Sequence, residues 1–251
     1  MKVSLIVPIY NERQHLAEFL LKVDTLVLPI DKELVIVDDC STDGSSQILD
    51  AYPFQTTCRI IHQPTNQGKG AAIQLGIKSA TGDIMGVQDA DFEYDMRDIS
   101  ALLKPFIEDR ADVVYGSRFK KSSEQVHRTF HYLINRLLTL LSNLCSGLYL
   151  TDMETCYKFF RRDVLTNIRL ESRRFGFEPE ITAKIARLKL RIVELPISYY
   201  PRNYLQGKKI SWKDGLAALR HIIYFNFFTP PQTFLDANLP KHYLASGDHW
   251  L

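Results

Sequence analysis

Short apolar runs alternate with amphipathic stretches through the first half of the chain, and this alternation limits the possible folds more than any other feature. The runs have the length of buried strands and lie at residues 3–8, 33–37, 59–62, 83–87 and 112–115. Between them, apolar residues recur with the spacing of a helix face, as Leu16, Phe19, Leu20 and Val23 do. Strands that alternate with helices predict an α/β fold with a mostly parallel sheet flanked by helices. Ligands of such folds bind at the carboxyl ends of the strands.

The second half of the chain has a different pattern. A long Leu-rich helix is predicted over residues 126–150, a helix near 180–188, an edge strand over 191–195 and a last helix over 212–228. Pro230 and Pro231 are expected to end the last helix, and the residues after 229 to form a loose tail. Because no linker separates two domains, we expect a single domain over residues 1–228 and a tail over 229–251.

Charge and composition exclude several classes of protein. The 251 residues carry 31 Lys+Arg and 29 Asp+Glu, a near balance that gives no support for a nucleic-acid-binding protein. The 45% hydrophobic content excludes a disordered chain. The four cysteines form no C-x-x-C pair, which favours a reducing cytoplasm. The first residues lack the features of a signal peptide, and no stretch reaches the roughly 20 uncharged apolar residues of a membrane-spanning helix.

Two aspartates follow the predicted strand at residues 83–87. Asp89 and Asp91 are separated by one residue, and Glu93 would lie on the same side if the segment were extended. Carboxylates in this arrangement can hold a hard divalent cation that bridges phosphate oxygens. The alternative is a solvated acidic turn, since a D-x-D pattern also occurs by chance.

Polar residues also follow the first two predicted strands. Asp38 and Asp39 close the second strand, where a carboxylate could bind a ribose hydroxyl or a base edge. An N-cap formed by residues 41–43 would explain one polar residue there, but not two carboxylates. In the same layer, Tyr10 and Glu12 offer a ring and a carboxylate to a nucleobase.

A glycine-bearing loop at residues 66–72 opens the next predicted helix. It matches neither the P-loop pattern nor G-x-G-x-x-G. Lys69 at a helix N-terminus is nevertheless a candidate anion contact, with a plain turn as the alternative.

Seven sequence blocks, taken in order, resemble those of known glycosyltransferases. Four are similar to the nucleotide-sugar half of family-2 glycosyltransferases, which have the A-type, Rossmann-like fold: PIYNE at 8–12, DDCSTDGS at 38–45, NQGKG at 66–70 and DAD at 89–91. Three resemble the branch of dolichol-phosphate mannose synthases and polyprenyl-phosphate glycosyltransferases: YGSRF at 115–119, TDMETCYK at 151–158 and FGFEPEIT at 175–182. The resemblance covers roughly residues 1–228.

The resemblance implies an inverting transfer of a hexose from a UDP- or GDP-hexose to a polyprenyl, dolichyl-type phosphate at the cytoplasmic face of a membrane. Residues 1–120 would form the nucleotide-sugar half and residues 121–228 the acceptor half. Mg²⁺ or Mn²⁺ would be held by Asp89, Asp91 and Glu93. The expected donor-binding residues are Pro8, Tyr10, Glu12, Asp39, Lys69, Asp89, Arg202 and Lys208. Arg202, Lys208 and Lys209 belong to a basic loop that could close over the donor or simply be solvated.

The acceptor phosphate is expected at Arg118, which ends a predicted strand beside Ser117. His131, Asn135 and Arg136 would complete this pocket, with His131 and Asn135 on one helix face. The resemblance places Asp152 near the acceptor or the sugar. The expected catalytic residues are Asp89, Asp91, Arg118 and Asp152. Many relatives read Asp-x-x-Ser-Gly-Phe-Arg where this chain has residues 152–158, a departure that leaves the identity of the sugar open.

The two helices at residues 126–150 and 212–228 have two interpretations. Leu-rich helices usually belong to a protein core, but basic and aromatic residues also suit amphipathic helices that lie on a bilayer. The resemblance favours helices that lie on the membrane surface, which the protein would reach directly or through a membrane-protein partner. It is also compatible with a homo-oligomer.

Two other functions remain compatible with the sequence. A saccharide or other hydroxyl acceptor would need a carboxylate base, for which Asp152, Glu178 or Glu180 could serve. A nucleotide-binding scaffold without catalysis is disfavoured by the intact Asp89, Asp91 and Arg118.

Overall fold

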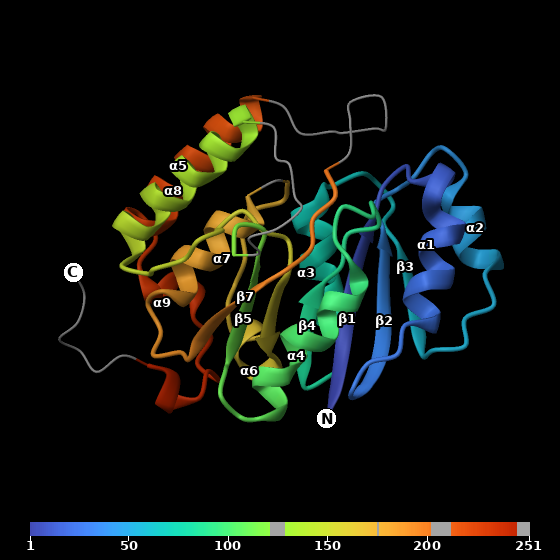
Figure 1. Ribbon diagram of the computed structural model, residues 1–251, viewed down its shortest axis with the longest axis horizontal. Coiled ribbons are helices and arrows are strands. Elements are labelled where there is room, and N and C mark those ends of the chain that lie inside the picture. Colours follow the sequence, from blue (N-terminus) through green and yellow to red (C-terminus); the bar gives the residue numbers. More distant parts are fainter. Residues whose placement is uncertain (121–128, 175, 202–211, 245–251) are drawn as a thin grey trace.

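The computed structural model describes residues 1–120, 129–174, 176–201 and 212–244 (Figure 1). These residues contain a seven-stranded sheet in the order β3-β2-β1-β4-β6-β5-β7. The strands are β1 (Lys2–Ile9), β2 (Asp31–Asp38), β3 (Cys58–His62), β4 (Ile84–Val87), β5 (Val113–Ser117), β6 (Lys158–Arg161) and β7 (Ile192–Pro196). All pairs are parallel except those that β6 forms with β4 and β5. The predicted α/β fold with a mostly parallel sheet is therefore confirmed.

Helices flank this sheet in the described part of the chain. They are α1 (Arg13–Thr25), α2 (Ser45–Ala51), α3 (Lys69–Ser79), α4 (Ile99–Ile107), α5 (Thr129–Ser146), α6 (Arg162–Leu165), α7 (Phe177–Ile185), α8 (Trp212–Phe227) and α9 (Pro231–Phe234), with short 3-10 turns η1 (Met96–Asp98) and η3 (Lys241–Tyr243). The central strand β1 is buried along most of its length, and because successive residues are buried, both of its faces belong to the core. This explains why its sequence reads as a continuous apolar run.

Strand β6 was not predicted, and it determines the geometry of the site. Only Phe159 and Phe160 make it apolar, and basic residues flank them on both sides. The strand runs antiparallel between β4 and β5, with Lys158 opposite Tyr115. Because its direction is reversed, its beginning lies where the neighbouring strands end. The segment that precedes Lys158 is thereby brought to the carboxyl edge of the sheet.

Gly86 makes room for this inserted strand. A Cβ atom built on Gly86 would lie 2.1 Å from Cε1 of Phe159, a distance that no side chain tolerates. The absence of a side chain in the middle of β4 therefore allows the Phe159 ring to lie over Gly86 on one face of the sheet.

The C-terminal residues do not form the loose tail that we expected. Phe234, Leu239 and Tyr243 are buried in the main core. Isolated bridges join Leu235 to Ile168 and Leu244 to Leu188. The prediction was wrong because proline can begin a helix as well as end one: Pro231 is the first residue of α9.

Helices α5 and α8 lie side by side at one end of the molecule, with α1 and α2 at the opposite end (Figure 1). The predicted long helix stops at Ser146, because Gly147 takes a left-handed φ of 72°. One face of α5 packs with α8 in a small cluster around Leu138 and Ile222. Four leucines on its other face are more than half exposed: Leu133, Leu137, Leu140 and Leu144. Among the described residues, no helix has the length and apolar character needed to cross a bilayer.

Candidate active site

The predicted site residues gather at the carboxyl edge of the sheet. Parallel strands β1, β2, β4 and β5 all end there, and the reversed strand β6 begins there. Asp39 follows β2, Asp89 follows β4 and Arg118 follows β5. The sequence interpretation of these three positions therefore agrees with the topology.

Asp39 organises the loop that leads into α3. Its buried carboxylate accepts hydrogen bonds from the Gln63 side chain and from the backbone amides of Gln67 and Gly68, each at 2.7 Å. Gly68 has a φ of 94°, and a side chain there would also collide with the backbone of Arg173. Asp39 thus fixes the glycine loop in addition to any contact that it makes with a ligand.

Residues 8–12 are tied to the loop after β2. The amide of Asn11 donates to Ser41, and the amide of Glu12 donates to Ser45. Pro8 lies within β1, whereas Tyr10 is exposed at the end of the strand. The segment therefore presents an exposed ring on a rigid base, which is compatible with the predicted contact to a nucleobase.

Asp38 has a structural role next to this site. Its buried carboxylate accepts from the amide of Ser41, from the hydroxyl of Ser46 and from His62. Burial would raise the pKa of Asp38, but these hydrogen bonds lower it below its usual value. The carboxylate therefore remains ionised and holds the β2–α2 turn.

Lys69 reaches from the first turn of α3 to three groups of the site. Its ammonium lies 2.9 Å from Asp89, 3.6 Å from Glu178 and 3.4 Å from the sulfur of Cys156. Burial acts to lower the pKa of Lys69, but the facing carboxylates raise it well above its usual value. A permanent positive charge is therefore present where the anion contact was predicted.

Asp91 and Glu93 lie on a turn, not on the extended segment that we expected. Phe92 between them adopts a left-handed φ of 57°, and the amide of Glu93 donates to Asp91. The Glu93 carboxylate is thereby turned toward the hydroxyl of Tyr199, at 3.0 Å. Within the part of the chain that the structure describes, no three or more His, Cys, Asp or Glu side chains form a ready metal cluster.

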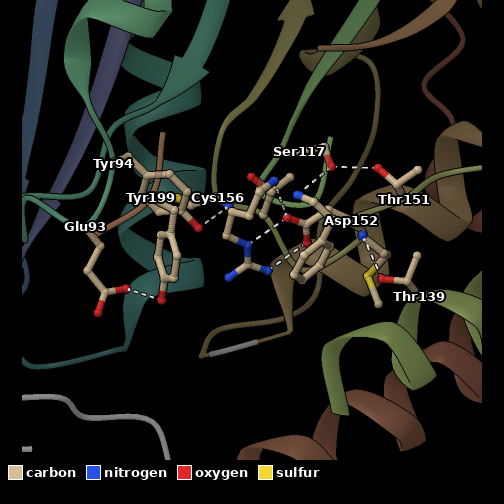
Figure 2. A network of polar contacts seen from close by, with 12 residues as sticks. Glu93, Tyr94, Ser117, Thr139, Thr151, Asp152, Cys156 and Tyr199 are labelled. Carbon is tan, nitrogen blue, oxygen red and sulfur yellow. Dashed lines mark hydrogen bonds and ion pairs between the residues drawn. The ribbon is translucent and has the colours of Figure 1, made fainter. Parts of the chain in front are cut away.

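Arg118 and Asp152 form a buried ion pair where the sequence predicted the acceptor phosphate. The guanidinium donates through Nε and Nη2 to the two carboxylate oxygens, both at 2.7 Å, and the Arg118 amide adds a third hydrogen bond. Figure 2 shows Asp152 in the middle of this network, with Ser117 and Thr151 on one side and Tyr199 and Glu93 on the other. The pair joins the end of β5 to the segment that precedes β6.

Glu194 holds the backbone that carries Asp152 in place. Its carboxylate accepts from the amides of Thr151 and Asp152 and from the Thr151 hydroxyl. Lys120 lies 3.3 Å from the same carboxylate. Sequence reasoning missed Glu194, although a glutamate inside the otherwise apolar β7 was a signal that could have identified it.

Arg136 approaches Arg118 across an aromatic ring. Both guanidinium carbons lie within 6 Å of the centre of the Phe119 ring, and Arg136 also donates to the carbonyl of Thr151. Arg118 and Arg136, both predicted to bind the acceptor phosphate, therefore lie close together. Asn135 is partly buried one position before Arg136. The side chain of His131 and the whole of Arg202, Lys208 and Lys209 lie outside what the structure describes.

The three candidate bases for a hydroxyl acceptor have different surroundings. Asp152 is engaged by Arg118. Glu180 accepts from the amides of Glu171 and Ser172 and pairs with Lys184, entirely within the protein. Glu180 thus fixes residues 171–172, which pack against the glycine loop. Glu178, which lies beside Lys69, is therefore the remaining candidate base for a hydroxyl acceptor.

Comparison with known proteins agrees with this geometry. The sequence matches the family described as Glycosyl transferase family 2 over residues 4–169, and the chain belongs to that family. It is 31% identical over 216 residues to the undecaprenyl-phosphate mannosyltransferase of Micrococcus luteus, a match that covers 83% of this chain and 87% of the relative. It is 30% identical over 224 residues to the dolichyl-phosphate beta-glucosyltransferase ALG5D of Trichomonas vaginalis, covering 83% of this chain and 68% of that protein.

A solved structure of low identity confirms the predicted A-type fold. The glucosyl-3-phosphoglycerate synthase of Mycobacterium tuberculosis, crystallised with Mn²⁺, UDP and phosphoglyceric acid, superposes with a TM-score of 0.69 at 17% identity. The match covers 91% of this chain and 80% of that one. The protein described here is a glycosyltransferase with this fold, as the sequence blocks had implied.

Proposed function

We propose that this enzyme transfers a hexose, with inversion, from a nucleoside-diphosphate sugar to a polyprenyl phosphate at the cytoplasmic face of a membrane. The observation that carries the proposal is the pair of arginines on the Phe119 ring. Arg118 stands at the polar edge of the sheet, and Arg136 stands on α5 among its exposed leucines. A phosphate attached to a long apolar chain needs this combination of charge and apolar surface. The names of the two relatives, which act on undecaprenyl and dolichyl phosphate, support it.

The donor would bind along the ends of β1, β2 and β4. Asp39 and residues 8–12 would hold the nucleoside, since they end adjacent parallel strands. Lys69 would face the diphosphate from the start of α3, with Arg202 and Lys208 closing from the loop. We assign the donor as a UDP- or GDP-hexose.

The carboxylates after β4 suit a divalent ion, Mg²⁺ or Mn²⁺. Asp89 is already placed to bind positive charge, because it holds the Lys69 ammonium at 2.9 Å. Asp91 follows two residues later, and Glu93 can join them if it leaves Tyr199. Oxygen ligands of this kind are those that Mg²⁺ and Mn²⁺ prefer. When bound, the ion would offset the negative charge that develops on the leaving diphosphate.

The residues on the acceptor side account for the rest of the chemistry. A phosphate oxygen of the lipid would form the new bond to the anomeric carbon, while the bond from that carbon to the nucleoside diphosphate breaks. A phosphate is ionised near neutral pH and needs no strong base, only orientation and positive charge. Arg118 and Arg136 would supply both, with His131 and Asn135 beside them. Asp152 would hold the Arg118 guanidinium in one orientation.

The exposed apolar face of α5 and α8 would rest on the membrane. Besides the α5 leucines, it includes exposed residues of the α8 side: Leu216, Ile223, Tyr224, Phe227 and Phe228. Tyr and Phe suit the boundary between headgroups and acyl chains. The enzyme would thereby reach a lipid acceptor from the bilayer surface.

The test is product formation from defined substrates. The enzyme is incubated with UDP- or GDP-hexoses, a short-chain polyprenyl phosphate and Mg²⁺ or Mn²⁺, and the glycosylated lipid is detected by mass spectrometry. We expect a polyprenyl-phosphate hexose with inverted anomeric configuration. Transfer to a saccharide but never to the lipid would overturn the proposal and favour a hydroxyl acceptor with Glu178 as base.

A further inference from the structure

The segment at residues 151–158 connects the acceptor side of the site to the donor side, and internal partners fix almost all of it. At its beginning, Thr151 and Asp152 are held by Glu194 and Arg118. The amide of Met153 donates to the hydroxyl of Thr139 on α5. This half of the segment is thus rigidly attached to the acceptor side.

The other half is attached to the donor side. The amide of Cys156 donates to the hydroxyl of Tyr94, and its sulfur lies 3.4 Å from the Lys69 ammonium. The hydroxyl of Tyr157 donates to Gln88 at 2.6 Å. Lys158 extends beneath the turn and donates to the carbonyls of residues 153 and 155. The backbone between these anchors is therefore held at both ends.

Two side chains in the middle of this rigid segment differ from the rest. Oε1 of Glu154 and Oγ1 of Thr155 are both buried, and neither has a hydrogen-bond partner among the residues that the structure describes. A buried polar atom without a partner is costly and is rare in folded proteins. Two adjacent ones, on a segment whose other buried side-chain polar atoms all have partners, indicate groups that a ligand completes.

Glu154 stands between the two halves of the site. Two residues before it, Asp152 pairs with Arg118, and two residues after it, the sulfur of Cys156 lies 3.4 Å from the Lys69 ammonium. The carboxyl group of Glu154 is also close enough to Glu178 for their charges to interact. Glu178 in turn faces Lys69, which holds Asp89. Under the proposed function, Glu154 therefore lies between the donor and acceptor sites, where the transferred hexose would bind.

The chemistry of the two side chains narrows the ligand. A carboxyl group repels phosphate, so Glu154 is unsuited to the diphosphate or to the lipid phosphate. A sugar hydroxyl both donates and accepts, so it can bind a carboxyl group in either protonation state and a threonine hydroxyl as well. We propose that Glu154 and Thr155 bind hydroxyl groups of the transferred hexose and determine which hexose is accepted. This inference rests on the proposed glycosyl transfer and deepens it.

The experiment measures donor binding without any acceptor. Calorimetry gives the dissociation constants of UDP, GDP, UDP-glucose, UDP-galactose and GDP-mannose for the wild type, Glu154→Gln, Glu154→Ala and Thr155→Val. Glu108→Gln is the matched control, since Glu108 is a surface glutamate at the end of α4. Thermal melting of each variant verifies that it is folded, and Glu154→Gln preserves the side-chain volume.

We expect the preferred nucleotide sugar to bind Glu154→Ala roughly ten- to a hundredfold more weakly. The affinity of Glu154→Ala for free nucleoside diphosphate should stay within about twofold of that of the wild type, because the free nucleotide lacks the sugar that Glu154 would bind. The preference between UDP-glucose and its epimer UDP-galactose should also shrink. If Glu154→Ala leaves both the affinity for the nucleotide sugar and the sugar preference unchanged, this inference is wrong and the proposed function still stands. The same holds if the variant loses affinity equally for sugar-bearing and free nucleotides. If the wild type binds no nucleotide and no nucleotide sugar, the proposed function fails, and this inference fails with it.

Discussion

The Arg118–Asp152 pair leads to the first prediction at the scale of single residues. Lysine cannot reproduce the planar fork that donates to both oxygens of Asp152, so Arg118→Lys should disturb the orientation of the acceptor phosphate. We expect acceptor-dependent turnover to fall roughly ten- to a hundredfold at saturating donor, with nucleotide affinity unchanged. Arg97→Lys is the matched control, because Arg97 makes the same forked contact with Asp95 on an exposed surface. An equal loss of donor affinity in Arg118→Lys would move Arg118 to the diphosphate site.

A second prediction concerns the pH dependence of stability at Glu154. Burial, and then the negative charge of Glu178, raise the pKa of Glu154 from 4.5 to about 7, against the opposing charges of Lys158 and Arg118. A raised pKa means that the folded protein holds the proton more tightly than the unfolded chain. The resulting stabilisation is complete below pH 4.5 and is lost as the pH rises through about 7.

Glu154→Gln removes this titration. The variant should match the wild type in free energy of unfolding near pH 4.5 and exceed it by on the order of 2–3 kcal/mol near pH 8. Denaturant unfolding of the ligand-free proteins at both pH values is the measurement. A variant that is less stable than the wild type at pH 8 would show that Glu154 has a structural partner.

The sequence predicted which residues reach this edge of the sheet better than it predicted what they contact there. Asp39, Asp89 and Arg118 follow strands that run parallel to one another, so their positions at one edge follow from the topology alone. Glu194 and Tyr199 reach the site from an edge strand and the residues after it, and only three-dimensional pairing brings them there. For the same reason, the sequence could not show that Asp152 forms an ion pair with Arg118.

At the scale of elements, the Glu33 side chain links the starts of β1 and β2 to the turn before β4. Its carboxylate, at the start of β2, accepts from Lys2 and Ser4 of β1 and from Thr81 before β4. Burial would raise the pKa of Glu33, but these hydrogen bonds lower it to about 2. A lowered pKa stabilises the fold above the ordinary value of 4.5, and the stabilisation is lost as the pH falls toward 2.

Glu33→Gln should therefore destabilise the sheet at neutral pH by on the order of 2–3 kcal/mol, and the difference should narrow as the pH approaches 2. Denaturant unfolding of both proteins over this range is the measurement. Asp31→Asn, at an exposed position two residues earlier in β2, should leave stability within about 0.5 kcal/mol. A gap between Glu33→Gln and the wild type that stays constant with pH would mean that packing, not ionisation, explains the loss.

The elements that the sequence did not predict share one physical cause. Strand β6 and helix α9 are each four residues long, too short for a periodic pattern to form. Tertiary contacts stabilise them instead: the Phe159 ring packs over Gly86 of β4, and Phe234 is buried in the core beside Lys184 of α7. The long strands and helices were predicted well, because each is long enough for its apolar residues to repeat several times at helix or strand spacing.

At the scale of the whole molecule, charge and apolar surface are separated in a way that suits a reaction at an interface. The carboxylates that we propose to face the donor lie at the middle of the sheet, and the exposed leucines lie on α5 at one end of the molecule (Figure 1). Arg118 and Arg136 occupy the boundary between them. A lipid phosphate would therefore meet the donor without its apolar chain having to leave the bilayer.

This arrangement predicts binding to vesicles through α5. Leu137 and Leu144 are 56% and 74% exposed, and burying the free part of one leucine in a bilayer contributes about 1–2 kcal/mol. The double change Leu137→Glu and Leu144→Glu should weaken co-sedimentation with equimolar phosphatidylcholine–phosphatidylglycerol vesicles at least about thirtyfold, the loss expected if each contact contributes about 1 kcal/mol. Leu21→Glu on α1, equally exposed at 56% but at the opposite end of the molecule, should bind as the wild type does. Nucleotide binding in solution should be the same for all three proteins. If vesicle binding survives the double change, or if the change instead dissociates a dimer seen by light scattering, the apolar face serves contact between protein chains and the membrane assignment is wrong.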